Sequence, residues 1–144
     1  MGGGRVLLEL FSGTGSVGKA ARRNGYQRVI SVDLDEQCDA DYVCDVRRLP
    51  YKKLPTPDFL WASPPCTTYS YAAIWCRHRD TNGKALSRDA EDADDILRCT
   101  FRIIAYFLRR NPRLKFCIEN PRGYMRKARE TRGLFRATTS YNCF

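Results

Sequence analysis

The sequence has little of what metal sites, secreted proteins and membrane proteins need. Its 144 residues include one histidine, His78, and no CxxC pair. Because a zinc site takes about four ligands at regular spacing, Cys76 and His78 alone do not predict one. No apolar run reaches membrane-spanning length, and the first residues, MGGGR, carry no apolar signal region. We therefore expect no metal site, no membrane contact and an intracellular protein, in the cytoplasm or nucleus of a host cell.

The cysteines and the charge distribution indicate the redox state and the kind of binding partner of this protein. The seven cysteines are odd in number and irregularly spaced, which is typical of reduced thiols. Lys and Arg number 25 against 16 Asp and Glu, so the formal net charge is +9. Twelve of the 25 basic residues lie between Arg98 and Arg136, with Glu119 and Glu130 as the only acids there. This one-sided distribution favours a polyanionic partner such as nucleic acid, although a solvated basic surface would look the same.

Short apolar runs alternate with helical patterns along the chain. We expect strands at residues 5–10, 28–32, 42–44, 58–62 and 115–118, and helices at residues 16–24, 35–41 and 89–110. Residues 67–88 predict a mobile polar loop, residues 121–136 are expected to be partly helical, and residues 138–144 look like the beginning of another strand. The alternation predicts one α/β domain over residues 1–144, with an open, mostly parallel sheet and helices on both faces.

A glycine-rich turn follows the first predicted strand. It reads Phe11-Ser12-Gly13-Thr14-Gly15, directly before a predicted helix. Two glycines let the backbone turn tightly and approach a ligand, and the helix offers free N–H groups to it. Many strand-to-helix turns need glycine for geometry alone, so this motif by itself leaves both interpretations open.

Two aspartates follow the next two predicted strands. Asp33 is placed to accept hydrogen bonds from both hydroxyls of a ribose, and Asp45 to accept one from an adenine amino group. The alternatives are a helix-capping aspartate and a turn residue. Because ligands of such sheets bind at the carboxyl ends of the strands, the three strand ends together outline a nucleoside site.

The strand at 58–62 leads into Ser63-Pro64-Pro65-Cys66, and the strand at 115–118 leads into Glu119-Asn120. Two prolines fix the backbone before Cys66, and nearby positive charge favours its thiolate. For the other six cysteines we expect small buried hydrophobic side chains. An acid after an apolar strand belongs at the rim of a site, where burial would raise the pKa of Glu119 and suit it to proton donation. A structural carboxylate is the alternative.

This order of motifs, including Pro-Cys-x-x-Tyr-Ser and Glu-Asn, resembles that of cytosine-5 DNA methyltransferases over nearly the whole chain. Small phage- or virus-type members look most similar. The resemblance implies a Rossmann-like fold that transfers a methyl group from S-adenosylmethionine to carbon 5 of cytosine in DNA. It implies Cys66 as the nucleophile and Glu119 with Asn120 at the cytosine. It also implies a cofactor pocket made by Phe11, Ser12, Gly13, Thr14, Gly15, Asp33, Leu34, Asp45, Val46 and Pro64.

The sequence departs from the family pattern at several points. Pro121 follows Glu-Asn where valine is usual, and Thr67 follows the nucleophile where glutamine is usual. A Gln-x-Arg-x-Arg strand and a separate target-recognition region are missing from the pattern. We therefore expect a catalytic domain that is incomplete at its C-terminus, with a partner chain or self-association completing the sheet.

Three other functions stay open. Ser63-Pro64-Pro65 resembles the loop of enzymes that methylate cytosine N4, although Cys66 stands where those enzymes need an aromatic residue. A non-catalytic nucleic-acid-binding remnant would keep the basic half and lose turnover. RNA is an alternative substrate to DNA, because a similar pocket methylates tRNA in some relatives.

Overall fold

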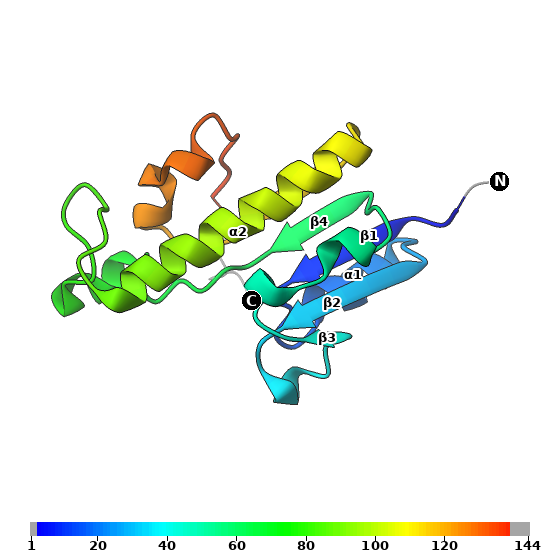
Figure 1. Ribbon diagram of the computed structural model, residues 1–144, viewed down its shortest axis with the longest axis horizontal. Coiled ribbons are helices and arrows are strands. Elements are labelled where there is room, and N and C mark those ends of the chain that lie inside the picture. Colours follow the sequence, from blue (N-terminus) through cyan, green and yellow to red (C-terminus); the bar gives the residue numbers. More distant parts are fainter. Residues whose placement is uncertain (1–2, 139–144) are drawn as a thin grey trace.

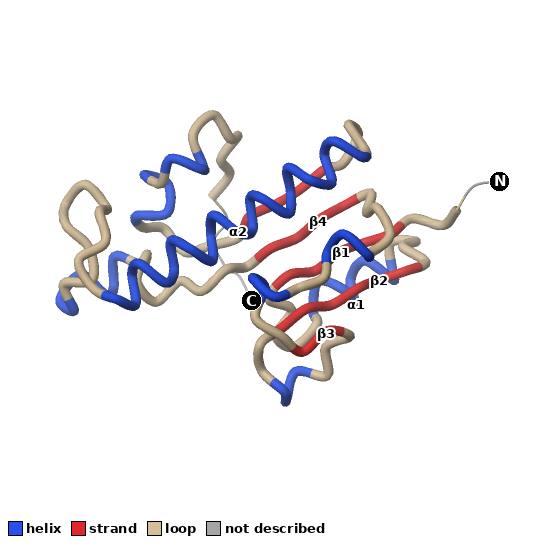
Figure 2. The backbone as a smooth tube through the Cα atoms, viewed as in Figure 1, coloured by secondary structure: helices blue, strands red, loops and turns tan. Residues whose placement is uncertain are grey.

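Five strands form a single sheet in the structure, a computed structural model that describes residues 3–138 except the side chains of residues 72–74. The strands are β1 (Val6–Leu10), β2 (Arg28–Asp33), β3 (Tyr42–Val43), β4 (Phe59–Ala62) and β5 (Lys115–Ile118). Their order is β3-β2-β1-β4-β5, and every pairing is parallel. The predicted open parallel α/β sheet is confirmed (Figure 2).

Two helices connect the strands on opposite faces. The first, α1 (Ser16–Arg23), joins β1 to β2, and the second, α2 (Arg88–Arg110), joins β4 to β5. Figure 1 shows α2 crossing in front of the sheet and α1 behind it. The arrangement follows from the strand order, because the chain moves outward in opposite directions from β1 and from β4. A right-handed crossover then places the two helices on opposite faces.

The side-chain alternation of β1 divides the core between these faces. Leu8 and Leu10 face α2 and pack with Ile103 and Phe107, while Leu7 faces α1 and packs with Ala21. Successive side chains of a strand point to opposite faces, so both halves of the core depend on the same five residues of β1. All three leucines of β1 are buried.

The remaining turns are 3-10 helices, whose positions the sequence predicted only in outline. They are η1 (Glu36–Cys38), η2 (Val46–Arg48), η3 (Tyr51–Lys53), η4 (Tyr71–Cys76), η5 (Tyr124–Lys127) and η6 (Arg129–Thr131). The helix predicted at 35–41 is shorter, because Asp35 caps η1 and Asp39 adopts a left-handed conformation that ends it. Residues 51–53 form η3, and the loop predicted at 67–88 contains η4.

The longest helix begins one residue before its predicted start. The side chain of Ser87 accepts a hydrogen bond from the backbone N–H of Ala90, which satisfies a donor that the first turn leaves free. Within residues 3–138, no helix is both long and apolar enough to span a membrane. The strand predicted at 138–144 lies outside the described residues, apart from Thr138.

Candidate active site

The glycine-rich turn after β1 is built from left-handed residues. Phe11, Gly13 and Gly15 have φ angles of 61°, 50° and 67°. Glycine adopts this conformation freely, whereas an aromatic residue does so rarely and at a cost in strain. The backbone N–H of Gly13 donates to the Asp33 carboxylate at 2.7 Å, so the turn is fixed to the end of β2. This hydrogen bond tethers the turn in which Phe11 keeps its strained conformation.

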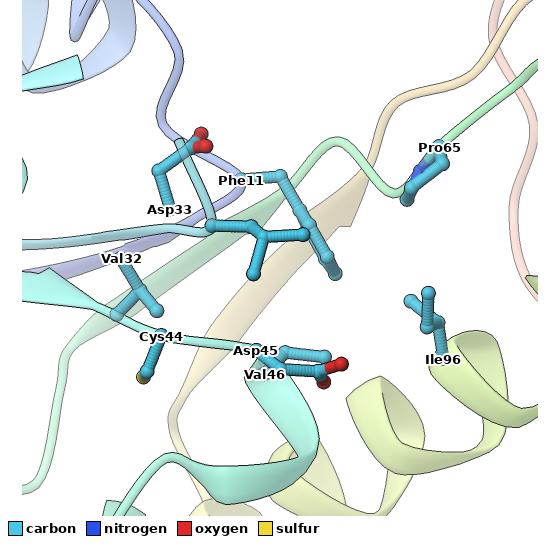
Figure 3. A pocket seen from close by; sticks show the side chains of 9 residues that line it. Phe11, Val32, Asp33, Cys44, Asp45, Val46, Pro65 and Ile96 are labelled. Atoms are coloured by element: carbon cyan, nitrogen blue, oxygen red, sulfur yellow. The ribbon is translucent and has the colours of Figure 1, made fainter. Parts of the chain in front are cut away.

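A cavity opens at the carboxyl ends of β1, β2 and β3. Its lining consists of Phe11, Val32, Asp33, Leu34, Cys44, Asp45, Val46, Pro65 and Ile96. Figure 3 shows Phe11 among these strand ends, with Pro65 and Ile96 on the far side of the cavity. Leu34 is 70% exposed, although it is a large apolar residue. The structure thus brings together five of the predicted cofactor residues: Phe11, Asp33, Leu34, Asp45 and Val46.

The two aspartates of this cavity already hold backbone groups. Asp33 accepts from the N–H of Gly13 and, at 2.9 Å, from the N–H of Asp35. Asp45 caps η2 and forms an ion pair with Arg47 at 2.5 Å. Hydrogen bonds from Arg47 lower the pKa of Asp45, so its carboxylate stays ionised and accepts hydrogen bonds at neutral pH. Asp33 and Asp45 therefore stabilise turns, as the alternative interpretation predicts, and they also line the cavity.

Other predicted cofactor residues lie elsewhere. Ser12, Thr14 and Gly15 line a second, polar cavity beneath α1, next to Glu9. The hydroxyl of Ser12 is buried there without a hydrogen-bond partner among the described residues. Pro64 is buried, and its neighbour Pro65 contributes to the first cavity instead. Gly13 supplies its N–H to Asp33 and does not line either cavity.

Glu9 is a buried acid that the sequence interpretation missed. It is 2% exposed, on the α1 face of β1, and accepts from the N–H of Gly18 at 2.9 Å. Burial raises the pKa of Glu9, while the hydrogen bond from Gly18 lowers it. A side chain at Gly18 would meet this carboxylate, because a Cβ atom there would lie 2.7 Å from Glu9 Oε2. The signal was available, since Glu9 interrupts an apolar strand.

The predicted catalytic residues follow the neighbouring strands β4 and β5. Ala62 pairs with Ile118, and the N–H of Glu119 donates to the carbonyl of Ala62 at 2.8 Å. The side-chain amide of Asn120 donates to the carbonyl of Pro64 at 2.9 Å. The Pro-Cys and Glu-Asn segments are therefore in direct contact. Cys66 and Glu119 are both half-buried.

A second contact joins the segments further along. The N–H of Tyr124 donates to the carbonyl of Tyr69 at 2.7 Å, next to a bridge between Ser70 and Gly123. A Cβ atom at Gly123 would lie 1.9 Å from the Tyr69 carbonyl oxygen, so only glycine permits this approach. This junction holds the arginine-rich segment 122–136 against the segment that follows Cys66.

The expectation that the other cysteines are buried holds for Cys99 and is wrong for the exposed Cys76, while Cys38, Cys44 and Cys117 are half-buried like Cys66. Burial raises the pKa of Cys44, Cys99 and Cys117, which favours the protonated thiol at neutral pH. The six described cysteines are unpaired, and Cys143 lies outside the described residues. The part of the chain that the structure describes holds no cluster of three or more His, Cys, Asp or Glu side chains able to bind a metal ion.

Comparison with known proteins supports one family. Residues 6–120 match the family model of the C-5 cytosine-specific DNA methylases. The chain is 39% identical over 127 residues to a probable DNA (cytosine-5)-methyltransferase of Frog virus 3 (isolate Goorha). That match covers 80% of this chain and 53% of the viral protein, so the chain spans about half the length of this relative. The residues that match the family model include every strand end described above, and the chain belongs to the C-5 cytosine-specific DNA methylase family.

Proposed function

We propose that this protein transfers a methyl group from S-adenosylmethionine to carbon 5 of cytosine in DNA, through a covalent bond to Cys66. The observation that carries the proposal is the hydrogen bond from Asn120 to Pro64, which joins the two segments bearing the nucleophile and the acid. Pro65, adjacent to Cys66, also lines the cavity at the ends of β1 to β3. A nucleoside cofactor in that cavity would therefore lie next to the reacting base.

The residues of the cavity suit such a cofactor. Asp33 offers a carboxylate to a ribose, and Asp45 offers one to an amino group. Phe11, Val46 and Ile96 supply apolar walls for an adenine ring, and the ring would shield the exposed Leu34 side chain from water. When bound, S-adenosylmethionine supplies a methyl carbon that is electrophilic because it is attached to a positively charged sulfur.

The protein's own groups then activate the cytosine. The Cys66 thiolate forms a bond from Sγ to carbon 6, while the Glu119 carboxylic acid gives its proton to N3. The electron pair of the ring moves to carbon 5. With S-adenosylmethionine bound, carbon 5 would take the methyl group as its bond to the sulfonium sulfur breaks, and S-adenosylhomocysteine would be the leaving group. Loss of the carbon 5 proton to a base then breaks the bond from carbon 6 to Sγ and releases Cys66 as thiolate, while N3 returns its proton to Glu119. A base inside a duplex is out of reach, so the cytosine must leave the helix first.

DNA as the substrate is supported by charge next to these residues. Arg122, Arg126, Lys127, Arg129 and Arg132 are all exposed in the segment that Gly123 joins to the Cys66 loop. Each Lys or Arg that contacts a phosphate strengthens binding without reading sequence.

The deciding experiment is transfer of labelled methyl groups to DNA and to RNA, followed by nucleoside analysis. Label in 5-methylcytosine of DNA supports the proposal. Label at N4 of cytosine, or in RNA alone, rejects it in favour of a different methyltransferase. Nucleic-acid binding without any label would indicate a remnant that has lost turnover.

A further inference from the structure

A buried arginine, Arg79, holds together the segment between Cys66 and α2. The sequence predicts a polar, mobile loop at residues 67–88, yet Arg79 in its middle is 7% exposed. The turn that follows is ordered by Asp80, whose carboxylate accepts from the N–H groups of Asn82 and Lys84. Arg79 and Ala85 form an isolated antiparallel bridge across this turn.

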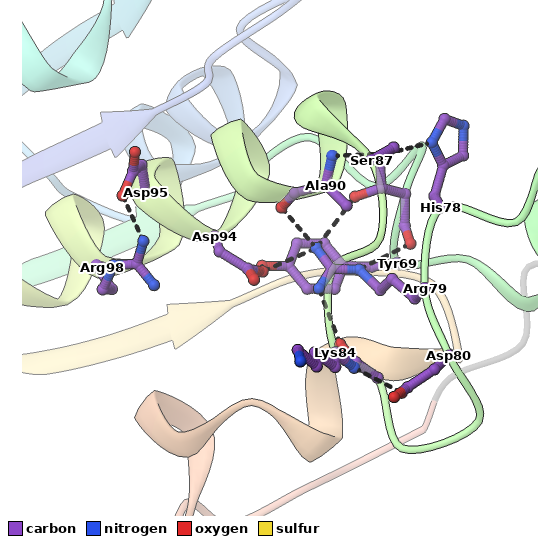
Figure 4. A network of polar contacts seen from close by, with 12 residues as sticks. Tyr69, His78, Arg79, Asp80, Lys84, Ser87, Ala90, Asp94, Asp95 and Arg98 are labelled. Carbon is purple, nitrogen blue, oxygen red and sulfur yellow. Dashed lines mark hydrogen bonds and ion pairs between the residues drawn. The ribbon is translucent and has the colours of Figure 1, made fainter.

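The guanidinium of Arg79 binds three parts of the chain at once (Figure 4). Its Nε donates to the Thr68 carbonyl at 3.0 Å, and its Nη1 donates to the Gly83 carbonyl at 3.0 Å. Its Nη2 reaches the Thr68 hydroxyl at 3.2 Å, the Ala90 carbonyl at 3.1 Å and the Asp94 carboxylate at 2.8 Å. The planar fork of arginine suits such divergent acceptors, and a lysine ammonium cannot reach all of them.

Tyr69 completes the arrangement. The Arg79 guanidinium lies over its ring, 3.9 Å from the centroid, and the Tyr69 hydroxyl donates to Asp94 at 2.5 Å. Tyr69 is 1% exposed, and burial together with Asp94 raises its pKa, so the hydroxyl remains a donor. Asp94 thus receives one hydrogen bond from Tyr69 and one from Arg79.

This arrangement leads directly to the nucleophile. The carbonyl of Cys66 accepts from the N–H of Tyr69 at 2.9 Å and from the N–H of Ser70 at 2.9 Å. Thr68 and Tyr69, the residues that Arg79 holds, therefore belong to the turn that begins at Cys66. On the other side of the turn, Asn120 holds Pro64. The backbone of Cys66 is fixed from both sides, and α2 is the support on the Arg79 side.

We propose that Arg79 is a positioning residue for the nucleophile: its guanidinium fastens the turn after Cys66 to the start of α2. Arg79 does not line the predicted cofactor cavity. The inference rests on the proposed function for its kinetic consequence, but not for its effect on the thiol. A small displacement of a reacting atom lowers the rate of a chemical step much more than it lowers substrate binding.

The test compares Arg79→Lys with Arg98→Lys. Arg98 is exposed and forms a surface ion pair with Asp95 on the same helix, so both variants keep the charge and only one loses a buried fork. We expect Arg79→Lys to lower kcat for methyl transfer by about tenfold to a hundredfold, with the KM for cofactor unchanged and a folded far-ultraviolet spectrum. Arg98→Lys should match the wild type. Equal kcat in both variants, or a parallel loss of cofactor binding, would overturn the proposal.

A second measurement does not need turnover. Alkylation of each thiol by iodoacetamide, followed by peptide mass spectrometry, reports how firmly Cys66 is held. Arg79→Lys should make alkylation of Cys66 several-fold faster and leave the alkylation rate of Cys38, in η1 after β2, unchanged. Asp94→Asn is a milder variant, because its amide oxygen still accepts from Arg79. It should also make alkylation of Cys66 faster, but by a smaller factor than Arg79→Lys does. If the wild type transfers no methyl groups, the proposed function fails while this arm still decides the role of Arg79. Unchanged alkylation of Cys66 in both variants rejects that role.

Discussion

The side-chain amide of Asn120 donates a hydrogen bond to the carbonyl of Pro64 at 2.9 Å, across the ends of β4 and β5. Replacing Asn120 with alanine leaves a buried carbonyl unpaired, which costs about 1–3 kcal/mol of unfolding free energy. We expect Asn120→Ala to lower stability by that amount and to slow methyl transfer as well, because Pro64 precedes Cys66 by two residues. Urea denaturation and single-turnover kinetics measure the two effects. Asn111→Ala, at the end of α2, is the control for stability without an effect on transfer.

Covalency at Cys66 can be observed directly. DNA containing 5-fluorocytosine should form a stable adduct with the protein, because fluorine blocks the final loss of the carbon 5 substituent. Cys66→Ala should abolish the adduct and keep cofactor binding. Cys76→Ala, an exposed cysteine in the same segment, should retain it. Denaturing electrophoresis detects the adduct, and an adduct in the Cys66 variant would show that another residue is the nucleophile.

Asp33 is expected to bind the cofactor ribose. Asp33→Ala should weaken binding of S-adenosylhomocysteine by about 1–3 kcal/mol, the range for an unpaired polar partner. It also removes the acceptor for the N–H of Gly13. Asp33→Asn keeps that acceptor in one orientation and should weaken binding less. Asp35→Ala, which removes only the cap of η1, is the matched control. Calorimetry giving equal affinity for all three variants would contradict the assignment.

Glu9 makes stability depend on pH. Its raised pKa means that the native state binds the proton more tightly than the unfolded chain, whose carboxyl has an ordinary pKa near 4.5. The contribution of Glu9 is therefore complete below about pH 4.5 and declines as pH rises through the folded-state value. Glu9→Gln, whose amide oxygen still accepts from Gly18, should lack this decline. Urea midpoints between acidic and neutral pH should show the wild type losing stability relative to the variant as pH rises.

The basic segment after β5 should govern how DNA binding responds to salt. Changing Arg122, Arg129 and Arg132 to glutamine should weaken binding and reduce the slope of log affinity against log salt by about 0.9 for each phosphate that is no longer neutralised. Arg22, Arg23 and Arg28 are also exposed and lie at α1 and the start of β2, so their triple glutamine variant controls for net charge. Fluorescence anisotropy at several salt concentrations gives the slope for each of the two triple variants. Identical slopes would place the DNA on another surface.

The sequence predicted the sheet well because β1, β2, β4 and β5 are short apolar runs, each ending in or followed by turn-forming or acidic residues such as Gly13, Asp33, Pro64 and Glu119. Each of these strands ends within one residue of its predicted limit. Within the 67–88 segment, the sequence did not predict η4 or the buried side chain of Arg79, because the hydrogen bonds of Arg79 to Thr68, Gly83 and Ala90 follow no local pattern. One signal existed: Asp94 lies between Ala90 and Leu97 on the buried side of α2, where an acid implies a buried cation.

The candidate site was predicted in its residue types and less well in its grouping. Asp33, Asp45 and Leu34 gather as expected, since parallel strands bring their carboxyl ends to one edge. Ser12 and Thr14 belong to the cavity beneath α1, together with Gly15, because the turn runs from the end of β1 to the start of α1. Ile96 of α2 enters the cavity from a helix far beyond Val46 in the sequence, and only the folded chain shows that proximity.

The strand order β3-β2-β1-β4-β5 reverses the direction of winding between β1 and β4. Loops that leave the two strands therefore diverge and open a crevice, the topological switch point at which open α/β sheets bind their ligands. The proposed cofactor residues lie mostly at the ends of β1, β2 and β3, with Ile96 contributed by α2, and the proposed reacting residues follow β4 and β5. The methyl group would have to cross only this crevice, which has Phe11 on the β1 side and Pro65 on the β4 side. Substitutions in the loops after β4 and β5 should therefore change which base is methylated without changing cofactor binding at the ends of β1 to β3.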